Sequence, residues 1–405
     1  MGLLLLAASA CSGTKLNDVG DVNAGAGGAP GAGGSHDVGG AMSPVGGRGG
    51  TSGGEGGFSG SRNIQSPIGG DGGEGPIGVS DAGASGAADA PIDCPTCTLV
   101  GSDEDIRGIA TDDQKVYWID YGTNDQLGNY NSDGRLLARD LSGGSTATLN
   151  GSLPGPIAVS VSSKYVYVFV DQRTQPSHAL GVMRVPLAGG AAQDIQGLEG
   201  ATYSTYRVFT SAPGYEYWNW GGAVYRIAET DGATVETFLT ARGVLDIQAD
   251  DTLLYYQDAT GVWTVPFAGG DPTPLVSTTG QAMTSLSGDY IYGVDSRYLT
   301  RVPKIGGAWK RFVDLMNASV DHFVVDGDSY VVATWLFEPN YGLREIAQGS
   351  LNNLAPPVVL ASEPFGGGNA AFNGWANSSV GVFVADSNGI YLVPHAAACD
   401  GGTCD

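Results

Sequence analysis

The 405-residue sequence contains few basic residues and few of the residue patterns found in catalytic centres. It has 19 Lys and Arg against 42 Asp and Glu, a formal net charge of −23. This balance argues against a nucleic-acid partner or an anionic surface held by electrostatics. The 4 histidines are widely spread, and no Gly-x-Ser-x-Gly elbow, His-Glu-x-x-His helix or Gly-rich phosphate loop occurs. We therefore expect neither catalytic residues nor a bound metal.

Long hydrophobic runs are also absent from the N-terminus. The apolar run at residues 3–8 is too short to span a bilayer. It is followed by Ser9-Ala10-Cys11, which is similar to the lipobox at which bacterial signal peptides are cleaved, although no Lys or Arg precedes the leucines. We expect residues 1–11 to be a signal peptide with Cys11 as the lipidation site. Ordinary signal cleavage and an unprocessed segment are the alternatives.

Aromatic residues are nearly absent from residues 12–93, where Phe58 is the single example. The segment is rich in Gly, with Ala, Ser, Pro and Asp, and has no Gly-x-x period of the collagen type. Such a chain buries too little apolar surface to offset its ordering entropy. We expect a disordered linker with a typical span on the order of 50 Å. An adhesive low-complexity segment is the alternative.

The remaining residues, 94–405, contain a weak unit of roughly 40 residues that recurs about seven times. The clearest copy joins four short apolar segments, at residues 109–111, 116–120, 136–141 and 146–149. Units of this length built only from strands indicate a β-propeller, because one blade cannot bury both faces of its sheet without neighbours. An aromatic residue marks the second strand of each unit: Tyr117, Tyr167, Tyr217, Tyr255, Tyr292, Tyr330 and Phe383. We predict an all-β, seven-bladed propeller, with six or eight blades as alternatives.

Two dipeptides recur late in the units. Gly-Gly occurs at 143–144, 189–190, 269–270 and 306–307, where a tight hairpin needs positive φ. Val-Pro occurs at 185–186, 265–266, 302–303 and 393–394. Because proline cannot donate a ladder hydrogen bond, each Val-Pro predicts the end of a strand.

Tyr117-Trp118-Ile119-Asp120 resembles the YWTD repeat of six-bladed propellers. An aromatic residue followed three positions later by Asp recurs at Asp258, Asp295 and Asp386, whereas the units at Tyr167, Tyr217 and Tyr330 lack that Asp. The chain is also similar to bacterial secreted lipoproteins in which a glycine-rich tether precedes a propeller, a group whose activity is mostly unassigned. This resemblance implies an exported protein, anchored by lipid in the bacterial envelope at the outer membrane or the cell surface.

The ends of the repeat region complement each other. Residues 97–100 look like a fourth strand, while the last unit stops after its third strand. We predict that residues 97–100 pair with residues 390–393 and close the ring. The flanking cysteines are Cys94, Cys97, Cys399 and Cys404. We favour at least one disulfide between the two ends, with local pairs Cys94–Cys97 and Cys399–Cys404 as one alternative and a zinc site as another.

Acidic pairs fall between the first and second strands of several units, at residues 112–113, 250–251 and 326–328. Their spacing does not match a known calcium loop. Asp in such places caps its own turn, so turn chemistry is favoured over Ca²⁺ binding and no cofactor is expected.

Aromatic and amide side chains gather in the links between second and third strands. The candidates for a ligand face are Tyr121, Tyr130, Trp220, Trp335 and Tyr341. Flat rings with neighbouring amides suit a glycan, a peptide or a protein segment. The alternative is that these rings pack between blades. We predict a monomeric binding module without enzymatic activity. The alternatives are a propeller enzyme of hydrolase, lyase or lactonase type, with carboxylates and His in the channel, and a structural surface protein.

Overall fold

The computed structural model describes residues 94–102, 105–123, 131–172, 179–198, 209–220, 222–241, 243–277, 281–315, 318–336, 343–352, 356–364, 374–386 and 389–396. Within these ranges every regular element is a strand, and the strands form seven antiparallel sheets of four. The predicted all-β, seven-bladed architecture is confirmed. Residues 1–93 lie outside the described ranges, and with them Cys11 and the predicted linker.

The first four blades follow one another along the chain. Their strands are β2 (Ile106–Thr111), β3 (Lys115–Asp120), β4 (Gly134–Asp140) and β5 (Ala147–Leu153); β6 (Pro156–Val161), β7 (Tyr165–Gln172), β8 (Ala179–Pro186) and β9 (Gln193–Leu198); β10 (Phe209–Ala212), β11 (Tyr215–Trp220), β12 (Ala223–Ala228) and β13 (Glu236–Thr240); β14 (Asp246–Ala249), β15 (Leu253–Gln257), β16 (Gly261–Pro266) and β17 (Thr273–Ser277).

The last three blades complete the set. Their strands are β18 (Ala282–Ser287), β19 (Tyr290–Asp295), β20 (Tyr298–Pro303) and β21 (Lys310–Asp314); β22 (Ala318–Asp326), β23 (Ser329–Leu336), β24 (Leu343–Ser350) and β25 (Val358–Pro364); β26 (Gly374–Ser378), β27 (Gly381–Asp386), β28 (Gly389–Pro394) and, from the start of the domain, β1 (Thr98–Gly101).

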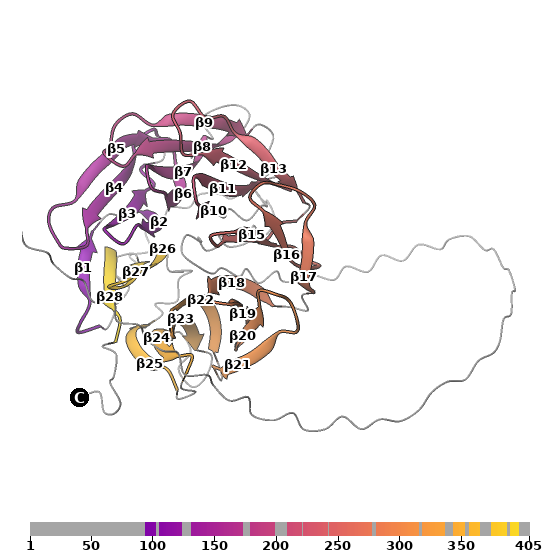
Figure 1. Ribbon diagram of the computed structural model, residues 1–405. Helices are drawn as coiled ribbons and strands as arrows, with labels where there is room; N and C mark the ends of the chain where they lie inside the picture. Colours follow the sequence, from indigo (N-terminus) through magenta and orange to yellow (C-terminus); the bar gives the residue numbers. More distant parts are fainter. Residues whose placement is uncertain are drawn as a thin grey trace, which may run out of the picture. The chain divides into compact units, whose positions relative to one another are not determined.

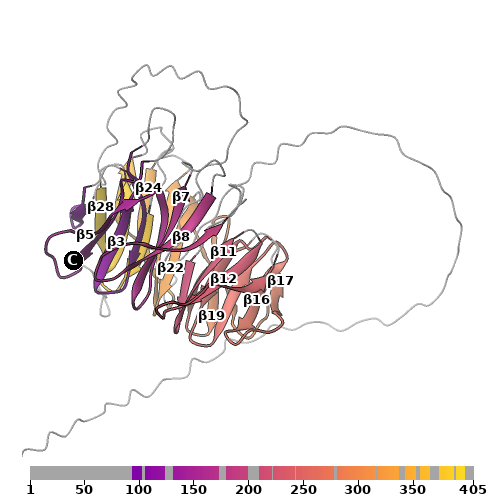
Figure 2. The same ribbon diagram turned by 90° about the horizontal axis from the view of Figure 1, so that it is seen from above.

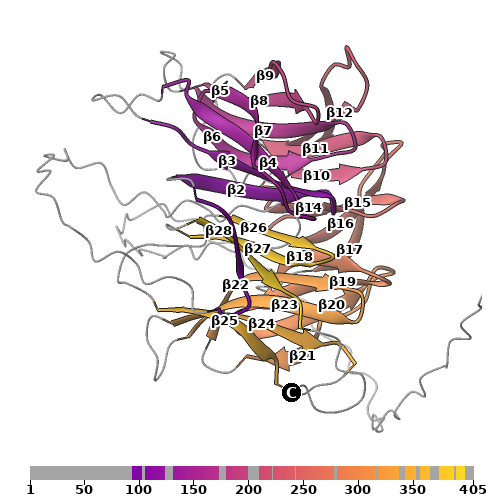
Figure 3. The ribbon, with the colours of Figure 1, turned by 90° about the vertical axis from the view of Figure 1, so that its left-hand side faces the viewer.

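The blades are arranged in a ring around a central channel, with the first strand of each blade innermost (Figure 1). Seen edge-on, the strands run across the thickness of the ring (Figures 2 and 3). In the described part of the chain no helix is long and apolar enough to cross a membrane.

The hydrophobic core lies between blades. Each of the seven core clusters draws its buried residues mainly from two adjacent blades. All seven predicted second-strand aromatics are buried, and each belongs to one of these clusters. Aromatic side chains bury the largest areas, so one ring per blade accounts for much of the packing between neighbouring sheets.

The recurring dipeptides take the predicted positions. All four Gly-Gly pairs have positive φ at both residues, between 82° and 134°. Pro186, Pro266 and Pro303 each end the third strand of their blade. Proline has no backbone N–H to donate, and at the end of a strand this absence does not interrupt the hydrogen bonds between strands.

The ring closes as predicted. β1 pairs with β28 in antiparallel register, with Thr98 opposite Leu392 and Leu99 opposite Tyr391. The strand covers residues 98–101, one position later than the predicted segment. The seventh blade is therefore built from both ends of the domain, which covers the edge of β28.

The favoured disulfide between the ends is wrong for the two N-terminal cysteines. Cys94 is bonded to Cys97, and their Cα atoms lie 5.3 Å apart. The backbone folds into a turn here, because the Cys97 amide donates to the Cys94 carbonyl at 3.2 Å. This turn holds the two cysteines at a separation that suits a disulfide. Cys399 and Cys404 lie outside the described residues.

Gly389 provides a test of the ring closure. Its φ is +151°, and a Cβ there would lie 2.4 Å from the Gly101 carbonyl oxygen of β1. Gly144 also has positive φ, at +118°, but a Cβ there would meet no atom within 4 Å. Gly389→Ala should therefore lower the free energy of unfolding by about 2 kcal/mol more than Gly144→Ala, as measured by chemical denaturation. Equal losses in the two variants would show that β1 does not approach Gly389 of β28 as closely as the structure has it.

Candidate functional site

One end of the central channel forms a cavity of about 710 Å³. We name it the turn-side cavity, because its rim consists of the turns between the first and second strands. All seven blades contribute to its wall, through Thr111, Asp113, Val161, Ser163, Phe209, Thr210, Ser211, Ala212, Pro213, Gly214, Glu229, Gln248, Ala249, Asp250, Asp251, Ser285, Leu286, Ser287, Gly288, Lys304, Asp326, Asn377, Ser378 and Ser379. The volume lies within the range of small-molecule sites, and the wall is mainly polar.

Aspartates shape two of these turns. Asp112 Oδ1 accepts hydrogen bonds from the amides of Gln114 and Lys115, and its Oδ2 accepts one from the Tyr117 hydroxyl at 2.8 Å. Asp250 repeats the pattern with the amides of residues 252 and 253 and with the Tyr255 hydroxyl at 2.9 Å. The prediction that these aspartates stabilise their turns is confirmed. Each also anchors a second-strand tyrosine five positions along the chain.

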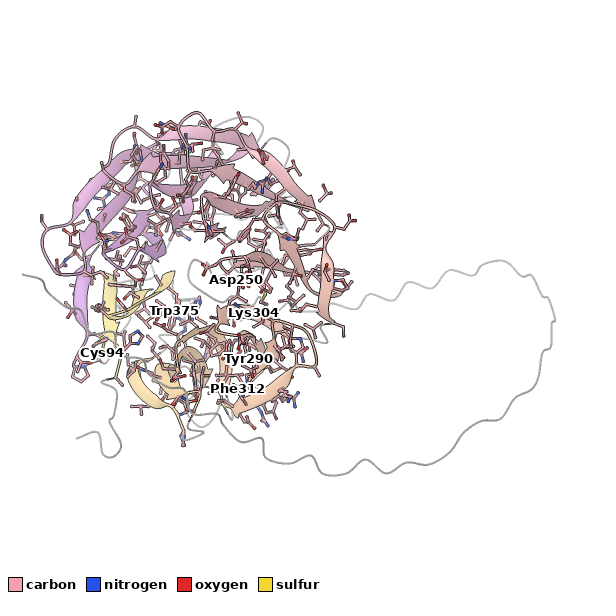
Figure 4. All side chains as sticks on the ribbon, viewed as in Figure 1. Cys94, Asp250, Tyr290, Lys304, Phe312 and Trp375 are labelled. Atoms are coloured by element: carbon pink, nitrogen blue, oxygen red, sulfur yellow. A yellow bond between two sulfur atoms is a disulfide. The ribbon has the colours of Figure 1, made fainter. Side chains whose placement is uncertain are left out.

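Asp250 is the centre of an ion pair in the cavity wall. Lys304, which follows β20 in the next blade, places its Nζ 2.9 Å from Asp250 Oδ2 (Figure 4). Burial opposes ionisation of Asp250, but the hydrogen bonds from Lys304 and from the turn amides outweigh it and hold its pKa below the ordinary value. Lys304 is the one cation among the residues described in the wall.

A fully buried carboxyl lies behind this wall. Glu216 on β11 has an exposed fraction of 0 %, and its Oε2 is 2.5 Å from the hydroxyl of Ser211, a wall residue. The same hydroxyl is 3.2 Å from the Val161 carbonyl oxygen. A serine hydroxyl has one proton and can donate to only one of these two acceptors. Protonation of Glu216 lets its Oε2 hydroxyl donate to Ser211 while Ser211 donates to Val161.

The surroundings of Glu216 favour the same protonation state. Burial raises its pKa to about 7, hydrogen bonding with the Ser211 and Ser160 side chains opposes the rise, and the charge of the nearby Glu229 adds to it. Tyr167 lies close enough for the Glu216 charge to raise the pKa of its hydroxyl, after the larger effect of burial. Glu229 itself lines the cavity and accepts a hydrogen bond from Ser163.

The structure separates three of the five predicted ligand-face residues from this cavity. Tyr121 follows β3, Trp220 ends β11 and Trp335 is the last residue but one of β23, so all three lie at the opposite end of the blades from the first turns. Tyr121 and Trp220 are 7 % and 5 % exposed and belong to one interblade cluster, so the alternative of packing between blades describes both. Trp335 is half-buried, with the Arg344 guanidinium 5.0 Å from its ring centre. Tyr130 and Tyr341 lie outside the described residues.

His322 lies on β22, the innermost strand of the sixth blade, and its side chain is buried. It is 1 % exposed and stacks on Trp375, with ring centres 5.2 Å apart. Burial, helped by the Arg344 charge, lowers its pKa to about 3. The imidazole is therefore neutral and serves interblade packing. No group of three His, Cys, Asp or Glu side chains suited to a metal ion occurs among the described residues.

Sequence reasoning missed Glu216, Glu229, Lys304 and Asn377. A glutamate inside the aromatic segment Tyr215-Glu216-Tyr217-Trp218 was a signal for a buried carboxyl. The acidic first turns were recognised, but only as local turns. Their convergence follows from ring closure, which a linear pattern does not display.

Glu216 gives the domain a specific pH dependence. The folded protein keeps its proton up to a pKa of about 7, whereas the unfolded chain releases it near the ordinary value of 4.5. This group therefore lowers the free energy of unfolding as pH rises from about 4.5 to about 7, by about 3 kcal/mol in total. Glu216→Gln is neutral throughout, so its stability relative to the native chain should rise across this window. Denaturation series at several pH values would measure the difference, and a constant difference would contradict a protonated Glu216.

Comparisons with known proteins support the fold alone. No protein-family model matches the chain, and no curated protein matches it by sequence. The β-propeller domain of the Trilobed protease from Pyrococcus furiosus, whose published description reports an open velcro topology, is 9 % identical with a TM-score of 0.50, over 74 % of this chain and 96 % of that one. TolB from Acinetobacter baumannii is 15 % identical with a TM-score of 0.41, over 63 % and 65 %. The similarity to the Trilobed protease domain supports a β-propeller fold, and at 9 % identity it carries no activity across.

Proposed function

We propose that this chain is a binding module whose ligand enters the turn-side cavity. The observation that carries the proposal is the convergence of seven blades on one polar cavity of about 710 Å³. Small-molecule and peptide sites are concave, with a few polar groups that fix the orientation of the ligand. A glycan, a peptide or a segment of a partner protein fits this description.

The proposal also covers where the module is located and which propellers it is related to. The similarity of residues 9–11 to a lipobox and the glycine-rich composition of residues 12–93 support a propeller tethered by lipid at Cys11 to the bacterial envelope. The Tyr-Trp-Ile-Asp segment supports a relationship to YWTD-like propellers. Its Asp120 accepts a hydrogen bond from Arg135 Nε at 2.8 Å, across from it on β4, so that aspartate has a structural role in this blade.

Catalysis is less well supported than binding. The carboxyl with a pKa near neutrality, Glu216, is sealed from the cavity by Ser211 and has no exposed surface. A general acid or base must come within hydrogen-bond distance of its substrate. Glu216 does not meet this condition in the structure, and His322 is buried in interblade packing.

A cavity-filling substitution tests the proposed function. Ser287 ends β18 and lines the cavity, whereas Ser142 is exposed in the turn after β4 and does not line it. The full chain, applied to immobilised glycan and peptide arrays, should bind specific members. Ser287→Trp should weaken that binding more than about tenfold, because the indole occupies ligand space.

Ser142→Trp serves as the matched control and should bind as the native chain does. If Ser287→Trp binds every array member as tightly as Ser142→Trp, or if the native chain binds none, the proposal is wrong.

A further inference from the structure

The interface between the second and third blades contains one hydroxyl group that faces two acceptors. Ser211 lies on β10, the innermost strand of the third blade, and its exposed side chain lines the turn-side cavity. Its Oγ is 2.5 Å from Oε2 of Glu216 and 3.2 Å from the carbonyl oxygen of Val161 on β6, the innermost strand of the second blade. A hydroxyl has one proton, so Ser211 donates to one of these oxygens at a time.

The proton on Glu216 decides which acceptor Ser211 uses. A protonated carboxyl donates to the Ser211 oxygen and leaves the Ser211 proton for the Val161 carbonyl. An ionised carboxyl has no proton to donate, and hydrogen bonds to a charged acceptor are stronger than those to a neutral carbonyl. Ser211 then turns to Glu216, and Val161 loses this donor. Because Ser211 and Val161 both line the cavity, a change at a fully buried group alters the wall.

The groups packed around Glu216 leave both of its forms accessible. The side chains that act on it are Ser160 on β6, Ser211 on β10 and Glu229, which follows β12, while Tyr167 faces it from β7. Burial and the Glu229 charge favour the protonated carboxyl, whereas the two serine hydroxyls favour the anion. Together they place its pKa at about 7, so Glu216 is neutral below this pH and ionised above it.

One cation belongs to the same interface. Arg184 on β8 is buried, its guanidinium lies 4.4 Å from the centre of the Tyr165 ring, and its Nε donates to Gln193 at 2.9 Å. Its charge opposes the rise that burial and Glu216 cause in the pKa of the Tyr167 hydroxyl. Among the described residues, Glu216 takes part in no ion pair with Arg184 or with any other cation.

We propose that Glu216 is a proton-controlled switch for the wall of the turn-side cavity. With the proton bound, Ser211 donates to Val161 and joins the inner strands of the second and third blades. Without it, Ser211 donates to Glu216 and this link between the strands is lost. The inference goes beyond the proposed binding function, because it concerns the wall itself and is tested without a ligand.

The NMR signal of the Val161 carbonyl in the full chain tests the switch. Protein labelled with ¹³C at Val carbonyls and ¹⁵N at Ser amides gives signals only where Val precedes Ser, as at Val161-Ser162 and Val276-Ser277. A carbonyl shift responds to the hydrogen bonds that the oxygen accepts. We expect the Val161 signal to move in one step with a midpoint at about pH 7. The Val276 signal, from the outer strand of the fourth blade, should stay constant.

Four variants locate the proton and its relay. Glu216→Gln keeps an N–H donor toward Ser211 without a titrating proton, so the Val161 signal should not move with pH. In Ser211→Ala the carboxyl still titrates, but the Val161 signal should no longer follow it. Glu229→Gln removes a neighbouring negative charge and should move the midpoint to lower pH. Asp271→Asn is the matched control, because Asp271 is exposed and does not line the cavity, and its midpoint should equal that of the native chain.

Two results would overturn the inference, with thermal melts showing that each protein is folded. One is a Val161 signal of the native chain that stays constant through the titration. The other is a signal that moves in Glu216→Gln or in Ser211→Ala as it does in the native chain. Neither result depends on the arrays. Loss of the switch therefore leaves the proposed binding function standing, and an array that captures nothing leaves the switch unaffected.

Discussion

Face-to-face packing between neighbouring blades is the constraint on which the rest of the structure depends. Each four-stranded sheet has two apolar faces, and a single blade cannot cover either by itself. The seven core clusters show the solution, because each lies between adjacent blades. A chain of such contacts has to close, since an open end would leave one face and one strand edge uncovered. β1 meets this requirement by pairing with β28.

Closure also creates the cavity. The first turn of each blade is a local feature, stabilised by bonds such as those from Asp112 to its own turn amides. When the ring closes, all seven turns come together at one end of the channel. Acidic residues separated by tens of positions in the sequence then line one wall. The acidic character of the cavity is thus a property of the ring and not of any one blade.

The fold could be predicted from the sequence because its signals are periodic and local. One aromatic per second strand, the Gly-Gly hairpins and the Val-Pro strand ends each report on a few neighbouring residues, and each prediction was confirmed. The site could not be predicted in the same way. Tyr121 and Trp220 resemble ligand contacts in sequence, yet packing between blades buries both. The sequence spacing also left several disulfide pairings open for Cys94. Its bond to Cys97 depends on a local turn, which the spacing allows but does not require.

The ring contains two kinds of acidic side chain, one buried and one exposed to solvent, and they differ in the protonation state that their surroundings favour. Glu216 is sealed behind Ser211, where a charge would have no water and few donors, so burial favours its protonated form. Asp251 lies in an exposed turn, where solvent can stabilise a charge without any protein partner. In its protonated form Glu216 adds no repulsion to the acidic wall, while the Lys304–Asp250 pair offsets one charge within it. The ring therefore carries more acidic than basic side chains in the wall of the turn-side cavity.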